Sequence, residues 1–108
     1  MIIKKTKAYE KSYKKIIKDK YLTREIERIR NIENIIISSK NLEDLVLNPY
    51  KEIYHIEQKK GDLKEFYTAR INDKIRLIMK PLGTYPYNKI EITEIEFINI
   101  DNKHYGEG

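Results

Sequence analysis

The chain of 108 residues lacks cysteine altogether and has only two histidines, four glycines and three prolines. The absence of cysteine excludes disulfide bonds and thiolate chemistry. Because His55 and His104 are far apart in the sequence and no cysteine can assist them, we predict no metal site and no cofactor. The low glycine and proline content, with 40% hydrophobic and 36% charged residues, is typical of a soluble globular protein.

Long apolar runs are absent as well. No segment approaches the roughly 20 apolar residues that a membrane-spanning helix needs, and the N-terminal region lacks the apolar stretch of a signal peptide. We therefore predict a cytoplasmic protein without a membrane partner. The length suits a single domain, residues 1–108, with one modest core.

The net charge of +5 is concentrated near the N-terminus. Residues 1–30 hold 11 Lys or Arg against 4 Asp or Glu, whereas residues 51–108 hold 10 of each. This asymmetry suits a polyanion or an acidic protein partner. A compositional bias is the alternative, because 17 of the 22 basic residues are lysines.

The first 40 residues are predicted to be mainly helical. Residues 2–4 are a candidate first strand, and residues 8–18 have apolar side chains at helical spacing with lysines on the other surface. This pattern predicts a basic amphipathic helix. A second helix, with isoleucines every three or four residues, is predicted to have Thr23 as its N-cap and to end near residues 38–41.

The second half is predicted to be mainly β-structure. Asn41 is expected to cap one or two helical turns that end near Asn48-Pro49. A change of phase among the apolar residues of the last strand predicts a β-bulge near Thr93-Glu94; a strand buried on both sides is the alternative. Strands are expected at residues 50–59, 67–71, 75–79 and 89–100, with a loop at 81–88. The element order predicts an α+β fold with the helices on one face of the sheet.

The two central strands are predicted to form a hairpin that carries two arginines. If Ile71 faces Ile75, the odd-numbered apolar residues share one face and Arg70 lies opposite Arg76 across a three-residue loop. A two-residue turn would mix charged and apolar residues on both faces, and we reject it for that reason. The three-residue loop is expected to require a left-handed conformation at Lys74.

The other face of this hairpin would be basic, with Thr68, Arg70, Arg76, Ile78 and Lys80 on it. Two opposed guanidinium groups repel each other, and an anion between them makes the arrangement favourable. The alternative is an ordinary solvated sheet face on which the arginines pair with Glu65, Glu94 or Glu96.

Three short motifs in this region carry a resemblance to a known family. The KGD at residues 60–62, the RIND at 70–73 and Arg76 resemble the hairpin of the plasmid-maintenance killer proteins, the HigB-like branch of the RelE/ParE toxin superfamily. The resemblance covers the chain from Tyr50 to the C-terminus. It implies a RelE-like fold, in which N-terminal helices pack on one face of a mainly antiparallel sheet of four to five strands.

The resemblance also implies an activity and partners. Such proteins are the toxins of type II toxin-antitoxin systems and act as messenger-RNA endoribonucleases, in many relatives on the ribosome. An antitoxin, often one with a helix-turn-helix DNA-binding part, holds them in check. The end of the chain, Asp-Asn-Lys-His-Tyr, is similar to an Asp-Tyr-His-like ending in killer proteins. Asp101 and His104 match the outer residues of that ending. This chain differs from it by two inserted residues and by having its tyrosine after the histidine.

RNA cleavage without a metal needs a proton acceptor, a proton donor and cations at the phosphate. Arg70 and Arg76 suit the phosphate because a guanidinium can hold two oxygens. His104 is the acid/base candidate, since imidazole titrates near neutral pH, and Tyr105 is a further catalytic candidate. Backbone contacts with RNA are predicted for Lys80, His55, Lys59 and Lys60.

Two other functions remain open at the level of the sequence. One is a ParE-like protein that inhibits DNA gyrase and has no nuclease activity. The other is a non-catalytic module of the same fold that uses its basic first helix and hairpin to bind RNA or an acidic protein. The first predicts toxicity that survives the loss of His104, and the second predicts salt-sensitive binding without a product.

Overall fold

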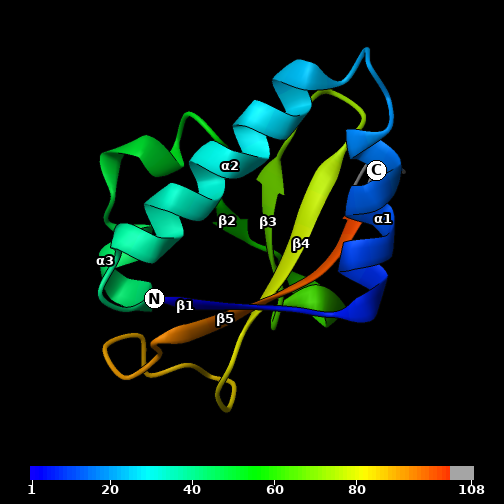
Figure 1. Ribbon diagram of the computed structural model, residues 1–108. Helices are drawn as coiled ribbons and strands as arrows, with labels where there is room; N and C mark the ends of the chain where they lie inside the picture. The colour runs from blue at the N-terminus through cyan, green and yellow to red at the C-terminus, as the bar shows by residue number, and fades with distance from the viewer. Residues whose placement is uncertain (103–108) are drawn as a thin grey trace.

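The computed structural model describes residues 1–102, in which helices cover one face of a five-stranded sheet (Figure 1). The strand order is β1-β5-β4-β3-β2; β1 is parallel to β5, and the other neighbours are antiparallel. This is the predicted α+β arrangement. The elements are β1 (Ile2–Lys5), α1 (Lys7–Ile17), α2 (Thr23–Ser38), α3 (Leu42–Val46), η1 (Pro49–Lys51), β2 (Glu57–Gln58), η2 (Gly61–Leu63), β3 (Tyr67–Arg70), β4 (Arg76–Pro81) and β5 (Glu94–Asp101).

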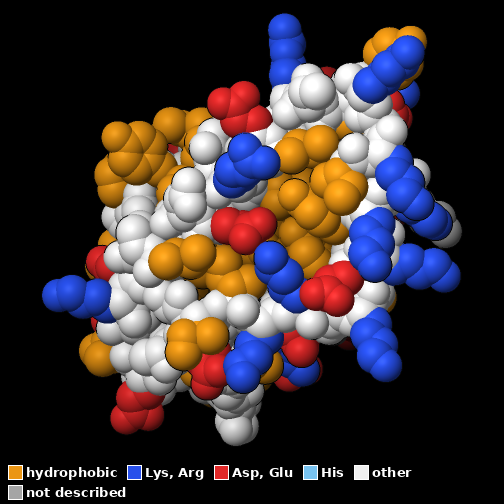
Figure 2. All heavy atoms as spheres, viewed as in Figure 1, with side chains coloured by type: hydrophobic (Ala, Val, Ile, Leu, Met, Phe, Trp, Pro, Cys, Tyr) orange, Lys and Arg blue, Asp and Glu red, His pale blue; other side chains and the backbone are white. Residues whose placement is uncertain are grey.

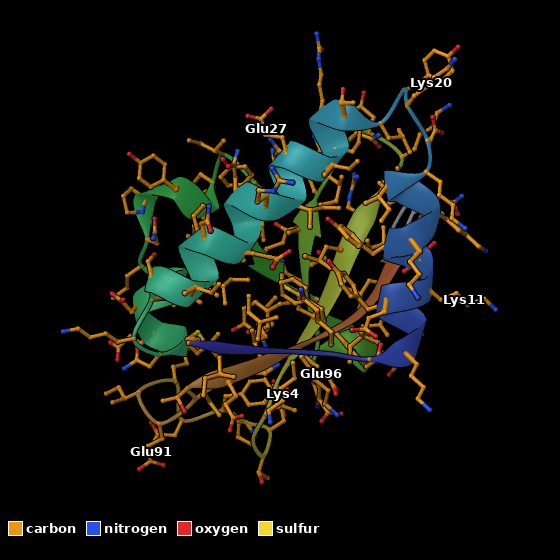
Figure 3. The ribbon with its side chains drawn as sticks, in the orientation of Figure 1. Lys4, Lys11, Lys20, Glu27, Glu91 and Glu96 are labelled. Carbon is orange, nitrogen blue, oxygen red and sulfur yellow. The ribbon has the colours of Figure 1, made fainter. Side chains whose placement is uncertain are left out.

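Helix α1 forms where the sequence predicts it, and its apolar side packs on β5. The hydroxyl of Thr6 caps the helix by accepting a hydrogen bond from the Tyr9 backbone N–H at 3.0 Å, and it donates to the Ile98 carbonyl at 2.6 Å. Tyr9 is buried with its ring 5.3 Å from that of Phe97. The lysines of α1 lie on the side away from the sheet, and Figure 3 shows Lys11 pointing outward.

Helix α2 buries the predicted isoleucine stripe, through Ile29, Ile32 and Ile36. The prediction that Thr23 is the N-cap of α2 is wrong, because Thr23 is the first residue of the helix. Leu22 occupies the cap position because its own N–H bonds to the Asp19 carbonyl in the preceding turn, and its carbonyl accepts the first helical bond. On this side of the molecule, Figure 2 shows hydrophobic side chains gathered between α1 and α2.

The predicted strand at residues 50–59 is wrong for most of its length. Pro49 occupies the first position of a 3-10 turn that Asn48 caps, and only Glu57–Gln58 pair with β3. His55 follows with φ of 49°, a left-handed conformation that interrupts any extended strand. The cap and the proline therefore outweigh the alternation of apolar residues.

The bulge in the last strand is real, but its predicted position is wrong. Ile78 of β4 lies opposite Asn99 and Met79 lies opposite Phe97, so the extra residue is Ile98 instead of one at positions 93–94. The bulge allows Phe97 and Ile100 to be buried on the same helix-covered side.

The hairpin register is confirmed, because Arg70 lies opposite Arg76 and the Ile71 N–H bonds to the Ile75 carbonyl at 3.0 Å. The left-handed conformation expected for Lys74 is wrong: among described residues other than glycine, only His55 has a positive φ. The Asn72 carboxamide oxygen closes the loop instead, by accepting from the N–H groups of Lys74 at 2.8 Å and of Ile75 at 2.7 Å.

Within residues 1–102, no helix is long and apolar enough to cross a membrane.

Candidate functional site

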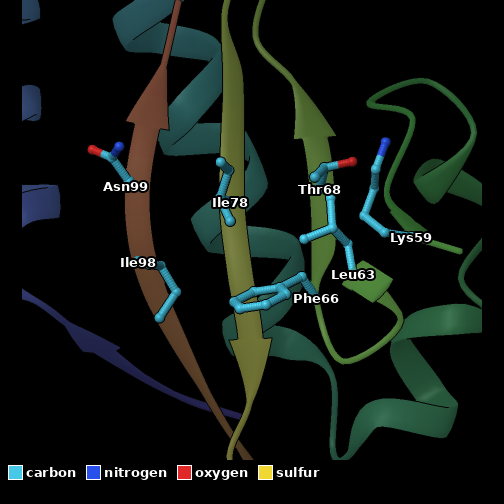
Figure 4. Close-up of a pocket in the computed structure, with 7 residues that line it drawn as sticks. All are labelled: Lys59, Leu63, Phe66, Thr68, Ile78, Ile98 and Asn99. Carbon is cyan, nitrogen blue, oxygen red and sulfur yellow. The ribbon is translucent and has the colours of Figure 1, made fainter. Parts of the chain in front are cut away.

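The face of the sheet opposite the helices, here called the open face, carries the even-numbered residues of β3 and β4. Tyr67, Ala69, Leu77 and Met79 point into the core, so their neighbours in sequence point the other way. After the bulge, β5 contributes Asn99 opposite Ile78 and Asp101 opposite Arg76. Figure 4 shows part of the open face, with strands in front and helices behind. The open face comprises Thr68, Arg70, Arg76, Ile78, Lys80, Asn99 and Asp101.

The two arginines occupy the end of the hairpin, where strand pairing brings their side chains close. The last backbone hydrogen bond of the hairpin before the loop joins Ile71 to Ile75. The Arg70 N–H points away from β4 and donates to the Tyr54 carbonyl at 2.7 Å. Arg70 and Arg76 are therefore a non-hydrogen-bonded pair, in which Cα atoms approach to about 4.5 Å and side chains are closest. The two cationic side chains therefore occupy the type of cross-strand pair in which the side chains are closest.

Arg76 is held in place by the loop that precedes it. Its Nη1 donates to the carbonyls of Asn72 and of Ile75, the latter at 3.2 Å. These bonds orient the guanidinium group and use one of its nitrogens. A planar group held in this way can present its other donors to an oxyanion with little loss of side-chain entropy.

Arg70 is half-buried, and its Nε is a buried donor without a hydrogen-bond partner among the described residues. A buried polar group left unpaired costs about 1–3 kcal/mol. Such groups are few in native proteins, and each calls for an explanation. Because this atom is buried, an acceptor from a ligand could reach it only if the Arg70 side chain moved.

Two of the three glutamates proposed as partners of the arginines bind lysines instead. Glu65 lies 4.0 Å from Lys80 and Glu94 lies 3.6 Å from Lys4. In the described part of the chain, no glutamate forms an ion pair with either arginine. The predicted pairing of the arginines with Glu65, Glu94 or Glu96 is therefore not found among these residues.

The predicted backbone-binding residues lie at different places around the open face. Lys80 projects over the Phe66 ring at 5.8 Å, and Lys59 lines a cavity on this face. Lys60 is exposed just before η2. His55 is exposed on the turn next to Tyr54, whose carbonyl binds the Arg70 backbone. Lys59 and Lys80 thus flank the same surface, whereas His55 adjoins it only through the backbone.

His104 and Tyr105 lie outside the described residues. Asp101, three residues before His104, lies opposite Arg76.

Arg28 is the residue that the sequence did not identify. From α2, its Nε donates to the Arg70 carbonyl at 2.6 Å and its Nη2 donates to the Ile53 carbonyl at 2.7 Å, while its guanidinium lies 4.6 Å from the Tyr54 ring centre. It joins the arginine hairpin to the turn that carries His55. In the sequence, Arg28 looks like any solvent-exposed arginine beside the buried isoleucine stripe of the helix, so no sequence signal separates it from an ordinary surface residue.

The tyrosines of the loop at residues 81–88 pack against each other and the sheet. The rings of Tyr85 and Tyr87 meet edge to face at 5.4 Å, and the Tyr87 hydroxyl donates to the Glu65 carbonyl at 2.6 Å. Burial, followed by the nearby Glu65 carboxylate, raises the pKa of Tyr87 to about 12. Tyr87 therefore stays protonated at neutral pH and acts as a hydrogen-bond donor.

No known family profile matches the sequence. No curated protein matches it either.

Solved structures do resemble the fold. YafQ from E. coli strain BL21(DE3) superposes with a TM-score of 0.65 at 14% sequence identity, covering 98% of this chain and 97% of YafQ. The YoeB/ParE toxin from Agrobacterium tumefaciens has a TM-score of 0.62 at 16% identity, covering 96% of this chain and 100% of that toxin. A chain of the E. coli DinJ-YafQ toxin-antitoxin complex has a TM-score of 0.62 at 16% identity, covering 98% of this chain and 96% of that chain.

The chain therefore has the α+β fold of the RelE/ParE-type toxins, as the hairpin motifs predicted. Assignment to the HigB-like branch stays a prediction.

Proposed function

We propose that this protein is the toxin of a type II toxin-antitoxin system and that it cleaves messenger RNA in the cytoplasm without a metal ion. The Arg70/Arg76 pair on the open face is the observation that carries the proposal. Two adjacent guanidinium groups suit a phosphodiester, whose negative charge increases as the attacking oxygen adds to phosphorus. The likeness to structures of toxins supports the same class of function.

The proposed reaction is attack by a ribose 2′-hydroxyl on the adjacent phosphorus, with loss of the 5′-oxygen of the next nucleotide. Arg70 and Arg76 bind the phosphate oxygens. His104 takes part in proton transfer, with Tyr105 as a second candidate from the same end of the chain. Lys59, Lys60, Lys80 and His55 contact the backbone of the RNA without reading its sequence.

The proposed partners follow from the same function. A cognate antitoxin would cover the open face with an acidic or apolar segment, and the ribosome would present the message. One of the similar structures is itself a toxin-antitoxin complex, which supports an antitoxin for this chain.

The test is induced expression of the wild type and of Arg70→Ala, Arg76→Ala and His104→Ala variants, with growth measured and the 5′ ends of cellular messages mapped. Arg30→Ala is the matched control, because Arg30 is exposed on α2. We expect growth arrest with new message ends for the wild type and the control. Both should be lost in the three site variants while circular dichroism shows that they remain folded.

Arrest without new message ends would overturn the nuclease and favour the gyrase-inhibitor alternative. The absence of arrest would leave only a binding module of this fold.

A further inference from the structure

An apolar cavity of about 190 Å³ lies on the open face (Figure 4). Phe66, Leu63, Ile78 and Ile98 form its apolar walls, and Thr68 and Asn99 add polar groups. The volume corresponds to roughly six water molecules in the liquid. It is large enough for one ring-shaped group.

The sheet itself forms the floor of this cavity. Thr68 of β3 and Ile78 of β4 are direct cross-strand partners, and they are only 5% and 8% exposed. The bulge in β5 inserts Ile98 as an extra residue beside them, and the η2 turn brings Leu63 to the other side. Since its floor belongs to paired strands, the cavity is preformed.

Cations surround the cavity. Lys59 is part of its wall, and the Lys80 ammonium lies 5.8 Å from the Phe66 ring centre. Arg70 follows Thr68 by two residues on β3, and Arg76 precedes Ile78 by two residues on β4. The arginine pair therefore lies about 7 Å along the strands from the Thr68–Ile78 pair. A ligand that fills the cavity would therefore carry an apolar ring and, a short distance away, a negative charge.

Two kinds of ligand meet this description: a nucleotide, or an apolar side chain from an acidic peptide. The polar side chains of the cavity separate them. Within residues 1–102, neither Thr68 nor Asn99 makes a side-chain hydrogen bond, so an aliphatic group would cover their donors and acceptors without satisfying them. The edge of a nucleobase offers both donors and acceptors.

We propose that this cavity holds one nucleobase of the RNA whose phosphate binds at Arg70 and Arg76. The base packs against Phe66, and Asn99 and Thr68 bind its edge. The cavity then determines base preference at one position next to the scissile phosphate. This inference rests on RNA as the proposed substrate class.

The test uses the full-length protein and short 2′-O-methyl oligoribonucleotides, which bind but lack the attacking hydroxyl. An abasic residue is placed at each position in turn, and affinity is measured by fluorescence anisotropy. We expect a loss of roughly 5- to 150-fold at one position, the size of a single base-stacking contact. The other positions should show smaller losses.

Two variants connect this effect to the cavity. Phe66→Leu keeps an apolar side chain but removes the aromatic face, and we expect it to abolish most of the abasic penalty. Asn99→Ala should reduce the difference in affinity among the four bases at the same position. Ile90→Ala, at a side chain 63% exposed in a distant loop, is the control and should behave like the wild type.

Equal affinity for all abasic oligonucleotides would overturn the inference, as would an unchanged penalty in Phe66→Leu. If Phe66→Leu weakened only the binding of an acidic protein partner, the cavity would belong to that partner. The result is separable from cleavage. A base effect without cellular cleavage contradicts the nuclease alone, and cleavage without a base effect contradicts the cavity assignment alone.

Discussion

Arg28 holds together two backbone segments that are distant in the sequence. Its guanidinium bonds to the carbonyls of Ile53 and Arg70 and lies over Tyr54. We predict that Arg28→Ala lowers the free energy of unfolding by about 2 kcal/mol, because it removes two charge-assisted hydrogen bonds and a cation–π contact. Urea denaturation measures this change. Arg30→Ala, at an exposed position of the same helix, should stay within about 0.5 kcal/mol of the wild type, and equal effects at both positions would contradict the role.

Tyr9 buries a hydroxyl group that has no hydrogen-bond partner among the described residues. Replacement by Phe removes this unpaired group, so we predict that Tyr9→Phe is as stable as the wild type or up to about 1 kcal/mol more stable at pH 8. A variant more than about 1 kcal/mol less stable would show that the hydroxyl finds a partner.

Tyr9 also predicts a dependence of stability on pH. Burial, followed by Glu33 and Tyr13, raises its pKa above the ordinary value of 10.0. The native state then keeps a proton that the unfolded state loses, so stability falls as the pH rises above about 10. Tyr9→Phe should lose less stability than the wild type between pH 8 and pH 11 in urea titrations. Identical losses would contradict the assignment. Tyr67 and Tyr87, whose pKa values are also raised, should preserve part of the fall.

At the scale of elements, the β3–β4 hairpin depends on the side chain of Asn72. Its oxygen accepts from the Lys74 and Ile75 N–H groups, and its nitrogen donates to the Glu25 carboxylate at 2.9 Å. We predict that Asn72→Ala lowers the free energy of unfolding by about 1–2 kcal/mol and speeds amide exchange at Ile75. Asp73→Ala, in the exposed part of the same loop, is the control. Unchanged exchange at Ile75 in Asn72→Ala would contradict this account.

The same hairpin explains which elements the sequence could predict. Its strict alternation and central turn residues determine the register locally, so the Arg70–Arg76 pair followed from the sequence. The strand predicted at 50–59 failed because Asn48 and Pro49 favour a 3-10 turn that the alternation does not reveal. The bulge was displaced because Ile92 is buried before β5 begins, whereas the prediction assigned it to the strand.

Only the part of the candidate site that depends on strand periodicity could be predicted from the sequence. The arginine face requires only strand periodicity. Arg28 and the cavity beside Phe66 depend on contacts between segments far apart in the chain, which periodicity does not contain.

At the scale of the whole molecule, the positive charge is distributed over both the helix side and the open face. The exposed lysines of α1 lie on the helix side (Figure 2), whereas Arg70, Arg76 and Lys80 lie on the open face. Lys15 of α1 lines a pocket together with Asn99 and Asp101 of the open face, so α1 adjoins the edge of that face. The alternative in which the basic first helix and the hairpin together bind RNA or an acidic protein stays a prediction.

The proposed binding of RNA on the open face predicts how RNA binding depends on salt. Each phosphate neutralised on a single strand contributes about −0.7 to the slope of log K against log salt concentration. Lys80→Ala and Arg76→Ala should each make the slope shallower by roughly that amount, whereas Lys11→Ala on α1 should leave it unchanged. Anisotropy titrations at several salt concentrations measure the slopes. If only Lys11→Ala made the slope shallower, the RNA would bind on the helix side instead of the open face.

The central claim is that the arginine pair binds an RNA phosphate, and the side-chain Nε–H resonances of Arg70 and Arg76 test it most directly. The chain has only five arginines, so these signals can be assigned by substitution. Upon addition of a 2′-O-methyl oligoribonucleotide, the Nε–H resonances of Arg70 and Arg76 should shift, because the phosphate binds both guanidinium groups. If the RNA binds while both resonances stay unchanged, the arginine pair is not the phosphate site.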